Sequence, residues 1–316
     1  MKIILDLDTG IDDALAIAYT LAQPKAELIG ITTLFGNVTV DLAVKNSLNI
    51  LDLLGHNEVP VFEGAAHPLE EKDYQTSDHL HLIHGLNGLG NVELGEPTRK
   101  KEQQSAVDFL IQSAEKYQNE LILVTAGPMT NLALALQKAP DSMKKIGKIV
   151  SMAGAVTTAG NVTPHAEANI YNDVPAAHYC LTHDVKMLLV GLDVTLKTMI
   201  TGKEINHWLV NNNRASQVFV DFSNYYYSNE YGDSAIGGAL HDPLAVALAL
   251  YPEWLTDSIM QNLTVEKENF AYGRTEADLS KLKHTQKSSE IAIDIATDEF
   301  IVDFISSVER VLSLGK

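Results

Sequence analysis

Short apolar runs alternate with longer amphipathic stretches along the first two-thirds of the chain. The runs have the length of buried strands, and the stretches repeat apolar residues at helical spacing, as Ala106, Phe109 and Leu110 do. This alternation predicts βαβ units and therefore a mostly parallel, doubly wound α/β sheet flanked by helices. The expected strands are residues 3–7, 28–33, 59–62, 121–124, 146–152 and 185–189, and the expected helices are residues 11–22, 40–54, 105–117, 130–137 and 174–181.

The last third of the chain has longer helical stretches and fewer strands. The pattern predicts helices over residues 204–227, 241–250 and 300–314, and strands over residues 263–267 and 291–295. No change of composition and no linker rich in Pro, Gly or Ser separates this part from the rest, so a single domain over residues 1–316 is expected.

Two segments, residues 66–102 and 223–239, lack a clear periodicity. The first is rich in His, Gly and acidic residues, and the second has four tyrosines followed by glycines. Long irregular loops in compact domains often act as lids or binding loops, which makes the first segment a candidate lid.

Charge and composition exclude several classes of partner. The net charge is −18, so the chain lacks the basic surface expected of a protein that binds nucleic acid or anionic membranes. No apolar run approaches the ~18 residues of a membrane span, and no signal peptide is recognisable, so a cytoplasmic location is expected. The single cysteine, Cys180, lies in an apolar stretch and is expected to be an inert core thiol.

Four acidic residues, Asp6, Asp8, Asp12 and Asp13, lie at the turn from the first strand to the first helix. Open α/β sheets bind ligands at such turns. Like charges ~4 Å apart repel by about 4 kcal/mol at an effective dielectric constant near 20, so the cluster needs a cation, protons or donors. A solvated acidic turn, with Asp12 favouring the helix N-terminus, would account for only one or two of the four.

Further polar residues follow other predicted strands. Taken alone, each has an ordinary explanation: His241 could be a hydrogen-bonded core histidine, and Asp242 could cap a helix. Carboxylates and amides with few cations together suit a hard metal such as Ca²⁺ and a neutral ligand with several hydroxyl groups. Zinc is not expected, because no paired His or Cys spacing is present.

The segment Asp6-Leu7-Asp8-Thr9-Gly10-Ile11-Asp12-Asp13 resembles the N-terminal signature of the inosine-uridine-preferring nucleoside hydrolases. The resemblance covers nearly the whole chain. The later matching motifs, in family order, are Asn37, Gly127-Pro128-Met129-Thr130-Asn131, Gly160-Asn161-Val162-Thr163-Pro164, Glu167-x-Asn169 and His241-Asp242-Pro243. The resemblance implies a Rossmann-like sheet with extra C-terminal helices, a homodimer or homotetramer, one Ca²⁺ per subunit, and hydrolysis of ribonucleosides to ribose and free base.

The resemblance also implies a role for individual residues. The calcium ligands would be the carboxylates of Asp8, Asp13 and Asp242 and the backbone carbonyl of Ala126. The ribose hydroxyls would be held by Asp12, Asn161, Glu167 and Asn169, with Asn37 close to the sugar and Met152 packed against its ring.

The implied mechanism has two proton transfers. Calcium acidifies and positions a water molecule, and Asp8 removes its proton as the water attacks the anomeric carbon through an oxocarbenium-like state. His241 is the first candidate to protonate the leaving base, and His84, in the candidate lid, is the second. Tyr227 and Tyr231 could stack on the base or relay a proton, but ordinary helix packing explains their spacing equally well.

The chain departs from the family pattern at two positions. Ala168 replaces a common aromatic residue, and Ala153 replaces a more usual glycine, which leaves the preference between purine and pyrimidine nucleosides open. Two alternatives are weighed against a hydrolase. One is a Mg²⁺-dependent phosphatase of the haloacid-dehalogenase type with Asp6 as nucleophile, although Gly10 then stands where Thr or Val is expected. The other is a non-catalytic protein that binds nucleosides or sugars.

Overall fold

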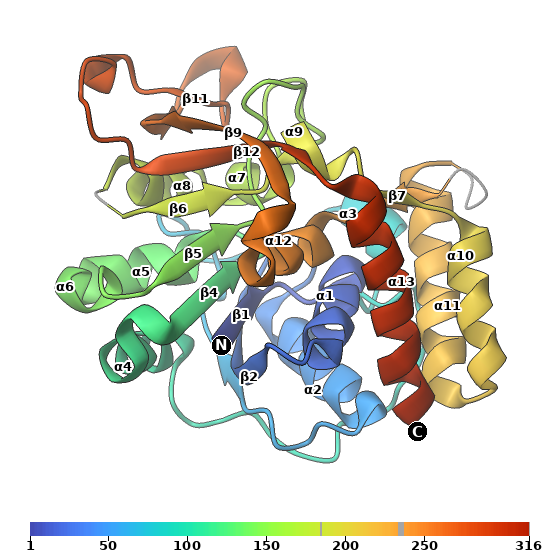
Figure 1. Ribbon diagram of the computed structural model, residues 1–316. Helices are drawn as coiled ribbons and strands as arrows, with labels where there is room; N and C mark the ends of the chain where they lie inside the picture. Colours follow the sequence, from blue (N-terminus) through green and yellow to red (C-terminus); the bar gives the residue numbers. More distant parts are fainter. Residues whose placement is uncertain (184, 233–236, 316) are drawn as a thin grey trace.

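A central eight-stranded sheet organises the computed structural model, which describes residues 1–183, 185–232 and 237–315 (Figure 1). All strand pairs in this sheet are parallel except β12–β9, at the edge. In spatial order the strands are β3 (Val61–Glu63), β2 (Glu27–Thr33), β1 (Lys2–Leu7), β4 (Leu121–Thr125), β5 (Lys148–Ser151), β6 (Met187–Leu189), β12 (Ser289–Ile295) and β9 (Leu255–Gln261). The doubly wound α/β prediction is therefore confirmed.

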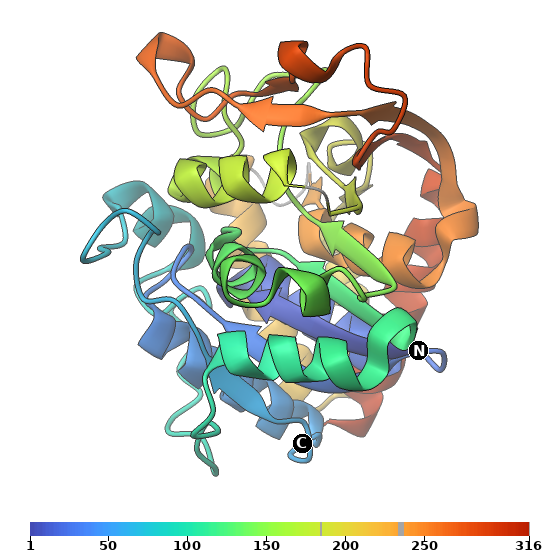
Figure 2. The ribbon, with the colours of Figure 1, turned by 90° about the vertical axis from the view of Figure 1, so that its left-hand side faces the viewer.

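Apolar side chains on both faces of β1 explain why helices cover the sheet on two sides. Ile3, Leu5 and Leu7 pack into one core with α1, α2, α11, α12 and α13, while Ile4 packs into a second core with α4, α5 and α8. The two helical layers lie on opposite sides of the sheet (Figures 1 and 2). Strands buried on both faces are typical of parallel sheets.

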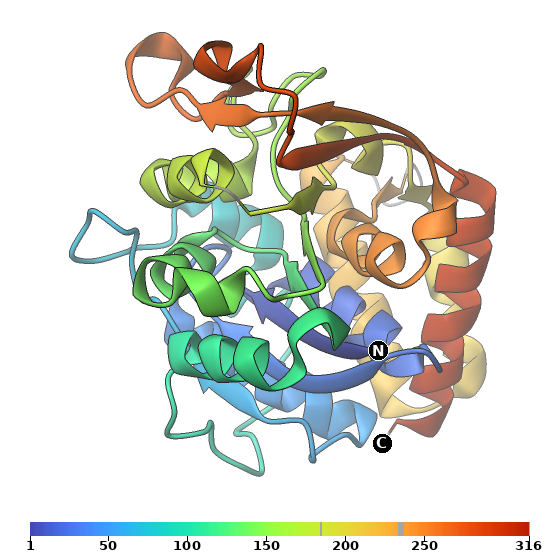
Figure 3. The same ribbon diagram turned by 60° about the vertical axis from the view of Figure 1, so that its left-hand side comes forward.

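The helices have the following bounds: α1 (Ile11–Ala22), α2 (Val40–Leu54), α3 (Asp78–His84), α4 (Ala106–Tyr117), α5 (Thr130–Lys138), α6 (Pro140–Met143), α7 (Ala168–Asn172), α8 (Val174–Thr182), α9 (Leu192–Thr195), α10 (Gly202–His207), α11 (Arg214–Glu230), α12 (His241–Leu250) and α13 (Thr297–Leu314). Two small antiparallel sheets pair β10 (Leu263–Val265) with β11 (Thr275–Ala277) and β7 (Met199–Ile200) with β8 (Gly238–Ala239). The β10–β11 pair lies beyond the β12–β9 end of the main sheet (Figure 3). In the described part of the chain, none of the helices has both the length and the apolar character needed to cross a bilayer.

The strand order places a topological switch point between β1 and β4. The chain leaves β1 toward β2 and β3 on one side, and then returns to β4, β5 and β6 on the other. In open α/β sheets the ligand crevice lies at the carboxyl ends of the strands at such a point. Asp8 follows the end of β1 and Ala126 follows the end of β4, so the fold brings these two segments together.

Three expectations from the sequence need correction. The helix predicted over residues 204–227 is divided into α10, a short 3₁₀ turn and α11, because Asn212 adopts a left-handed backbone conformation (φ 49°) and the side chain of Asn213 caps α11. The edge strand β9 was not predicted, because its mixed polar sequence lacks a clear apolar face. The strand predicted over residues 263–267 ends at Val265 and belongs to a small sheet.

The two unassigned segments contain regular structure. The first includes α3, whose N-terminus is capped by the side chain of Ser77. The second begins inside α11 and ends in β8, and its residues 233–236 lie outside the described part of the chain.

Candidate active site

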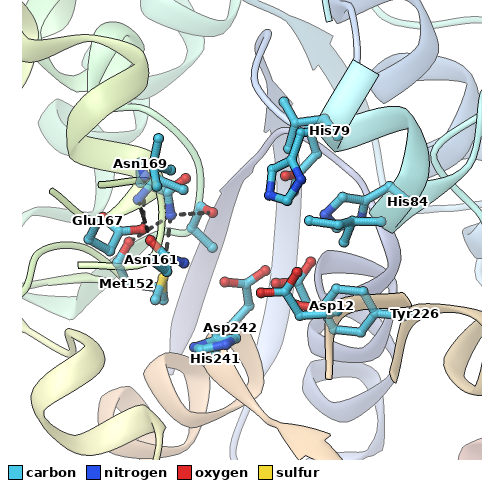
Figure 4. A pocket seen from close by; sticks show the side chains of 17 residues that line it. Asp12, His79, His84, Met152, Asn161, Glu167, Asn169, Tyr226, His241 and Asp242 are labelled. Carbon is cyan, nitrogen blue, oxygen red and sulfur yellow. Dashed lines mark hydrogen bonds between the residues drawn. The ribbon is translucent and has the colours of Figure 1, made fainter. Parts of the chain in front are cut away.

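A pocket opens at the predicted crevice. Met152, Asn161, Glu167 and Asn169 project from one wall, and Asp12, His79, His84 and Tyr226 project from the opposite wall, with His241 and Asp242 between them (Figure 4). The remaining lining residues are Asn37, Leu80, Ile83, Ala126, Val162, Ala168 and Glu230. The pocket therefore joins segments from the first, middle and last thirds of the chain.

Three buried carboxylates meet at this pocket. Asp12, Asp13 and Asp242 each offer an oxygen atom, and these three atoms lie within 4.8 Å of one another. Asp12 and Asp13 are in the first turn of α1, and Asp242 is in the first turn of α12, which is buried at all ten of its positions. Because α12 packs against α1, the two acidic turns face each other across a rigid contact.

The carboxylate group (Asp12, Asp13 and Asp242) fits a metal ion. One oxygen of each carboxylate is buried without a hydrogen-bond partner in the described structure: Oδ1 of Asp12, Oδ1 of Asp13 and Oδ2 of Asp242. Buried, unpaired carboxylate oxygens are costly unless a cation or a proton compensates them. Hard divalent cations prefer such all-oxygen ligands.

The pKa values of these acids report the same uncompensated charge. Burial, and then the charge of Asp12, raises the pKa of Asp13 to about 8. Burial raises the pKa of Asp12 to about 6, and burial together with the neighbouring acids raises that of Asp242 well above its ordinary range. Without a cation, the folded protein therefore holds protons at this group that free carboxylates would release.

Asp8 is fully buried beside this group but does not belong to it. Its two oxygens accept hydrogen bonds from the backbone N–H of Asn37 (2.7 Å) and from its side-chain amide (3.2 Å). Gly36 permits this contact, since a Cβ there would lie 1.8 Å from Asp8 Oδ2. Burial, and then the charge of Asp13, raises the pKa of Asp8 well above its usual range. Asp8 is thus close to Asp13. Of the hydrogen-bonded residues Asp8 and Asn37, Asn37 is the one that lines the pocket.

The opposite wall is organised by backbone contacts. Glu167 caps α7 and accepts the N–H groups of Gly154, Asn169 and Ile170 at 2.8–3.1 Å. The side-chain amide of Asn169 donates to the carbonyls of Ala126 and Met152, both at 3.0 Å. Glu167 and Asn169 therefore lie together on this wall, next to the carbonyl expected to bind the metal, whereas Asp12, also predicted to hold the ribose, projects from the opposite wall (Figure 4).

Three histidines line the pocket, and the contacts of two of them, His241 and His84, fix their rings. His241 Nδ1 lies 2.8 Å from Thr195 Oγ1, and its Nε2 lies 3.1 Å from Tyr231 Oη. His84 accepts the backbone N–H of Ile11 at Nδ1 (3.4 Å) and stacks on the ring of Tyr226. Burial lowers the pKa of His241 to about 4 and that of His84 to about 3, so either ring, once protonated, releases its proton readily.

The sequence matches the family described as inosine-uridine preferring nucleoside hydrolase over residues 3–302. The chain belongs to this family. It is 36% identical over 256 residues to the probable uridine nucleosidase 1 of Oryza sativa subsp. japonica, which covers 81% of this chain and 78% of the relative. It is 33% identical over 306 residues to the pyrimidine-specific ribonucleoside hydrolase RihA of Citrobacter koseri, 95% of this chain and 96% of the relative.

A solved structure gives the same result. The purine-preferring ribonucleoside hydrolase from Gardnerella vaginalis matches with a TM-score of 0.96 and 41% identity, and the match covers 100% of both chains. The protein is therefore an enzyme that hydrolyses the N-glycosidic bond of ribonucleosides. This result favours neither the phosphatase nor the non-catalytic binding protein. The carboxylate group of this nucleoside hydrolase could hold a metal ion.

The two tyrosines suggested by the sequence have different surroundings in this nucleoside hydrolase. Tyr227 is fully buried, packs against Gly238 and does not line the pocket, so its position favours the packing explanation. Tyr231 contacts His241, as a proton relay requires. The neighbouring residue, Tyr226, is the tyrosine that lines the pocket.

Sequence reasoning missed three polar or aromatic lining positions of the hydrolase. These are His79, Tyr226 and Glu230. His79 and Ile83 are one helical turn apart on α3, and both line the pocket. If residues 78–84 had been predicted as a helix, this spacing would have placed both side chains on the same face. Tyr226 and Glu230 are also spaced by one turn, on α11.

Proposed function

We propose that this hydrolase uses one Ca²⁺ ion per subunit, held at the carboxylate group, to cleave purine and pyrimidine ribonucleosides. The observation that supports the proposal is a set of three carboxylates that each place an oxygen within 4.8 Å of the other two, and that each have one buried oxygen without a hydrogen-bond partner among the described residues. Six to eight oxygen ligands are usual for calcium, and waters and ribose hydroxyls would complete the set.

Four groups would hold the ion. The resemblance assigns Asp8, Asp13, Asp242 and the carbonyl of Ala126, whereas the geometry brings Asp12 into the group with Asp13 and Asp242. We propose that Asp13 and Asp242 are ligands in either case. When bound, the ion would acidify and orient the attacking water.

Asp8 would accept the proton of the attacking water. Burial and the charge of Asp13 raise the pKa of Asp8, which gives its carboxylate a higher proton affinity than a free carboxylate and supports this role. Asn37, which contacts both Asp8 and Asp13, would keep the two carboxylates in a fixed relation.

The ribose would lie against Asp12, Asn161, Glu167 and Asn169, with Met152 packed on the ring. Carboxylate and amide oxygens on both walls of the pocket would stabilise the positive charge that develops on the sugar in the transition state. Asn161 is the most exposed of the four, so it would close on the sugar from the solvent side.

The leaving base would take a proton from the histidine side of the pocket. We propose His241 as the donor and Tyr231, which contacts its Nε2, as the group through which a proton is resupplied. His84 is the second candidate donor, held between Ile11 and Tyr226. The relatives named above include enzymes described as acting on uridine, pyrimidine and purine nucleosides, which is why both base classes are proposed.

We further propose a homodimer or homotetramer and a cytoplasmic location, both from the family resemblance. The acidic net charge supports a partner set without nucleic acid or membranes.

One assay tests the proposed activity and its metal. The purified protein is incubated with inosine and with uridine, with and without a chelator, and released ribose is measured. We expect ribose release that the chelator abolishes and that added Ca²⁺ restores more fully than Zn²⁺. Binding of nucleoside without cleavage would favour the non-catalytic alternative, and restoration by Mg²⁺ alone would overturn the assignment of calcium.

A further inference from the structure

The short helix α9 lies directly beside His241. Its last residue, Thr195, is fully buried, and Thr195 Oγ1 is 2.8 Å from His241 Nδ1. The turn after α9 also holds the chain that precedes the histidine, since the backbone N–H of Leu240 donates to the carbonyl of Thr198 (2.9 Å). Both the backbone before His241 and the His241 side chain are therefore fixed by one segment.

Thr195 is itself firmly placed. Its carbonyl accepts the hydroxyl and the backbone N–H of Thr198, at 2.7 and 3.0 Å, and its own N–H donates to Gly191. The side chain of Asp193, on the same helix, accepts the backbone N–H groups of Val156 and Thr157, which begin the loop that carries Asn161. The same four-residue helix thus contacts both the ribose wall and the histidine.

We propose that Thr195 is a positioning residue for the reaction: its hydroxyl anchors Nδ1 of His241 so that Nε2 alone exchanges partners. The proposal rests on the role of His241 stated above. Of the two contacts to the ring, the one to Thr195 is fully buried and shorter (2.8 Å), and the one to Tyr231 is longer (3.1 Å) and partly buried. Nε2 can therefore leave Tyr231 for the departing base while the ring keeps its orientation.

The chemistry of a hydroxyl group suits this task. It can accept a hydrogen bond from a protonated ring nitrogen or donate one to an unprotonated nitrogen, so it holds Nδ1 in either tautomer of the ring. Valine has nearly the same shape and offers neither bond, so the ring nitrogen would be buried without a partner. Serine restores the hydroxyl with one methyl group fewer.

The test compares Thr195→Val, Thr195→Ser and His241→Ala with a matched control, Thr20→Val. Thr20 is also a buried threonine, but its hydroxyl bonds only the carbonyl of Ala16 in α1, away from the pocket. Each variant is assayed on inosine, on uridine and on p-nitrophenyl riboside, whose leaving group departs as a stable anion and needs no proton. Thermal melting checks that each variant is folded.

We expect Thr195→Val to lower kcat on inosine and uridine roughly 5- to 150-fold, the range for a lost buried hydrogen-bond partner. Its rate on p-nitrophenyl riboside should stay within about twofold of wild type, because that reaction bypasses the acid. Thr195→Ser should recover most of the nucleoside rate, and Thr20→Val should change all three rates equally or not at all.

If His241→Ala impairs the nucleoside reactions selectively, the proposed acid stands, and two results for Thr195→Val would then overturn only the role of Thr195. One is a normal rate on the nucleosides, and the other is an equal loss on all three substrates. Normal nucleoside rates for His241→Ala would instead overturn the proposed acid, and with it the role of Thr195. If Thr195→Val does not fold, Thr195→Ala takes its place: a loss on the nucleosides with a retained p-nitrophenyl riboside rate would support the inference, and normal rates or an equal loss on all three substrates would overturn it.

Discussion

Removal of the metal should destabilise this protein, and more strongly at pH 8 than at pH 6. In the metal-free folded protein, Asp13 keeps its proton up to a pKa of about 8, and Asp12 up to a pKa of about 6, whereas both would ionise near 3.8 in the unfolded chain. Because the folded state then binds more protons than the unfolded state, its stability falls as the pH rises from about 4 to about 8. Below about pH 4 both carboxyl groups are protonated in the folded and unfolded states alike, so this loss of stability is absent.

The structure gives the magnitude of the effect. Two ionised carboxylates 4.8 Å apart repel by roughly 3.5 kcal/mol at an effective dielectric constant of 20, and the carboxylate group contains three such pairs. The shift of the Asp13 pKa from 3.8 to about 8 corresponds to roughly 5 kcal/mol at pH 8, with burial as its first cause and the charge of Asp12 as its second. A bound cation therefore has several kcal/mol of burial cost and repulsion to offset.

The assay is calorimetric melting at pH 6 and pH 8, in excess Ca²⁺ and in excess chelator. A free Ca²⁺ concentration about 1,000-fold above the dissociation constant stabilises a protein by about 4 kcal/mol. For a chain of 316 residues this corresponds to a rise of about 6 °C in melting temperature. At pH 6 the ion must displace a proton from Asp13, so the rise should be smaller.

Two variants control this experiment. Asp13→Asn should abolish both the chelator effect and its pH dependence, whereas Asp108→Asn, at an exposed ion pair with Lys138, should leave both unchanged. An equal melting temperature with and without chelator at pH 8, or a larger shift at pH 6, would show that the buried carboxylates need no cation, and the electrostatic reasoning would be refuted.

Three further substitutions test individual residues. Asp8→Ala should lower kcat on every nucleoside by at least 100-fold, measured as ribose release, and a near-normal rate would remove Asp8 as the base. His241→Ala should impair purine and pyrimidine substrates unequally, because different bases depend differently on protonation; a small, equal loss would transfer the acid role to another residue. Tyr227→Phe should leave activity unchanged and should not lower the melting temperature, because the buried Tyr227 hydroxyl has no hydrogen-bond partner within the described structure; a clear loss of activity would return Tyr227 to the site.

The fold was predictable because its signals are local. The alternation of apolar runs and amphipathic stretches predicted the order of strands and helices along the chain, whereas the switch point between β1 and β4 comes from the spatial order of the strands in the structure. Strand β9 was missed because its side chains are exposed or partly exposed on both faces, so no period marks it. The break between α10 and α11 was missed because Asn212 and Asn213 are ordinary polar residues unless the left-handed turn is known.

Only those residues of the candidate site that belong to a recognisable sequence motif could be predicted. The acidic turn and the segments around Glu167 and Asn169 were identified from their residues and resemblance, and they lie in one pocket. The tyrosine that lines the pocket is Tyr226, the neighbour of the suggested Tyr227. Successive residues of a helix point in directions 100° apart, so an error of one position selects a side chain on another face. Thr195 carries no motif, and its contact with His241 depends on tertiary structure alone.

The carboxylate group joins the first helix of the chain to a helix that begins at residue 241. During synthesis, Asp12 and Asp13 emerge early, but the third carboxylate is absent until most of the protein has been made. The strands β1 to β6 therefore precede in the chain the helix that completes the proposed cation site, and the site is complete only when α12 has docked on α1. Occupancy of this site would thus report that the final third of the polypeptide has folded.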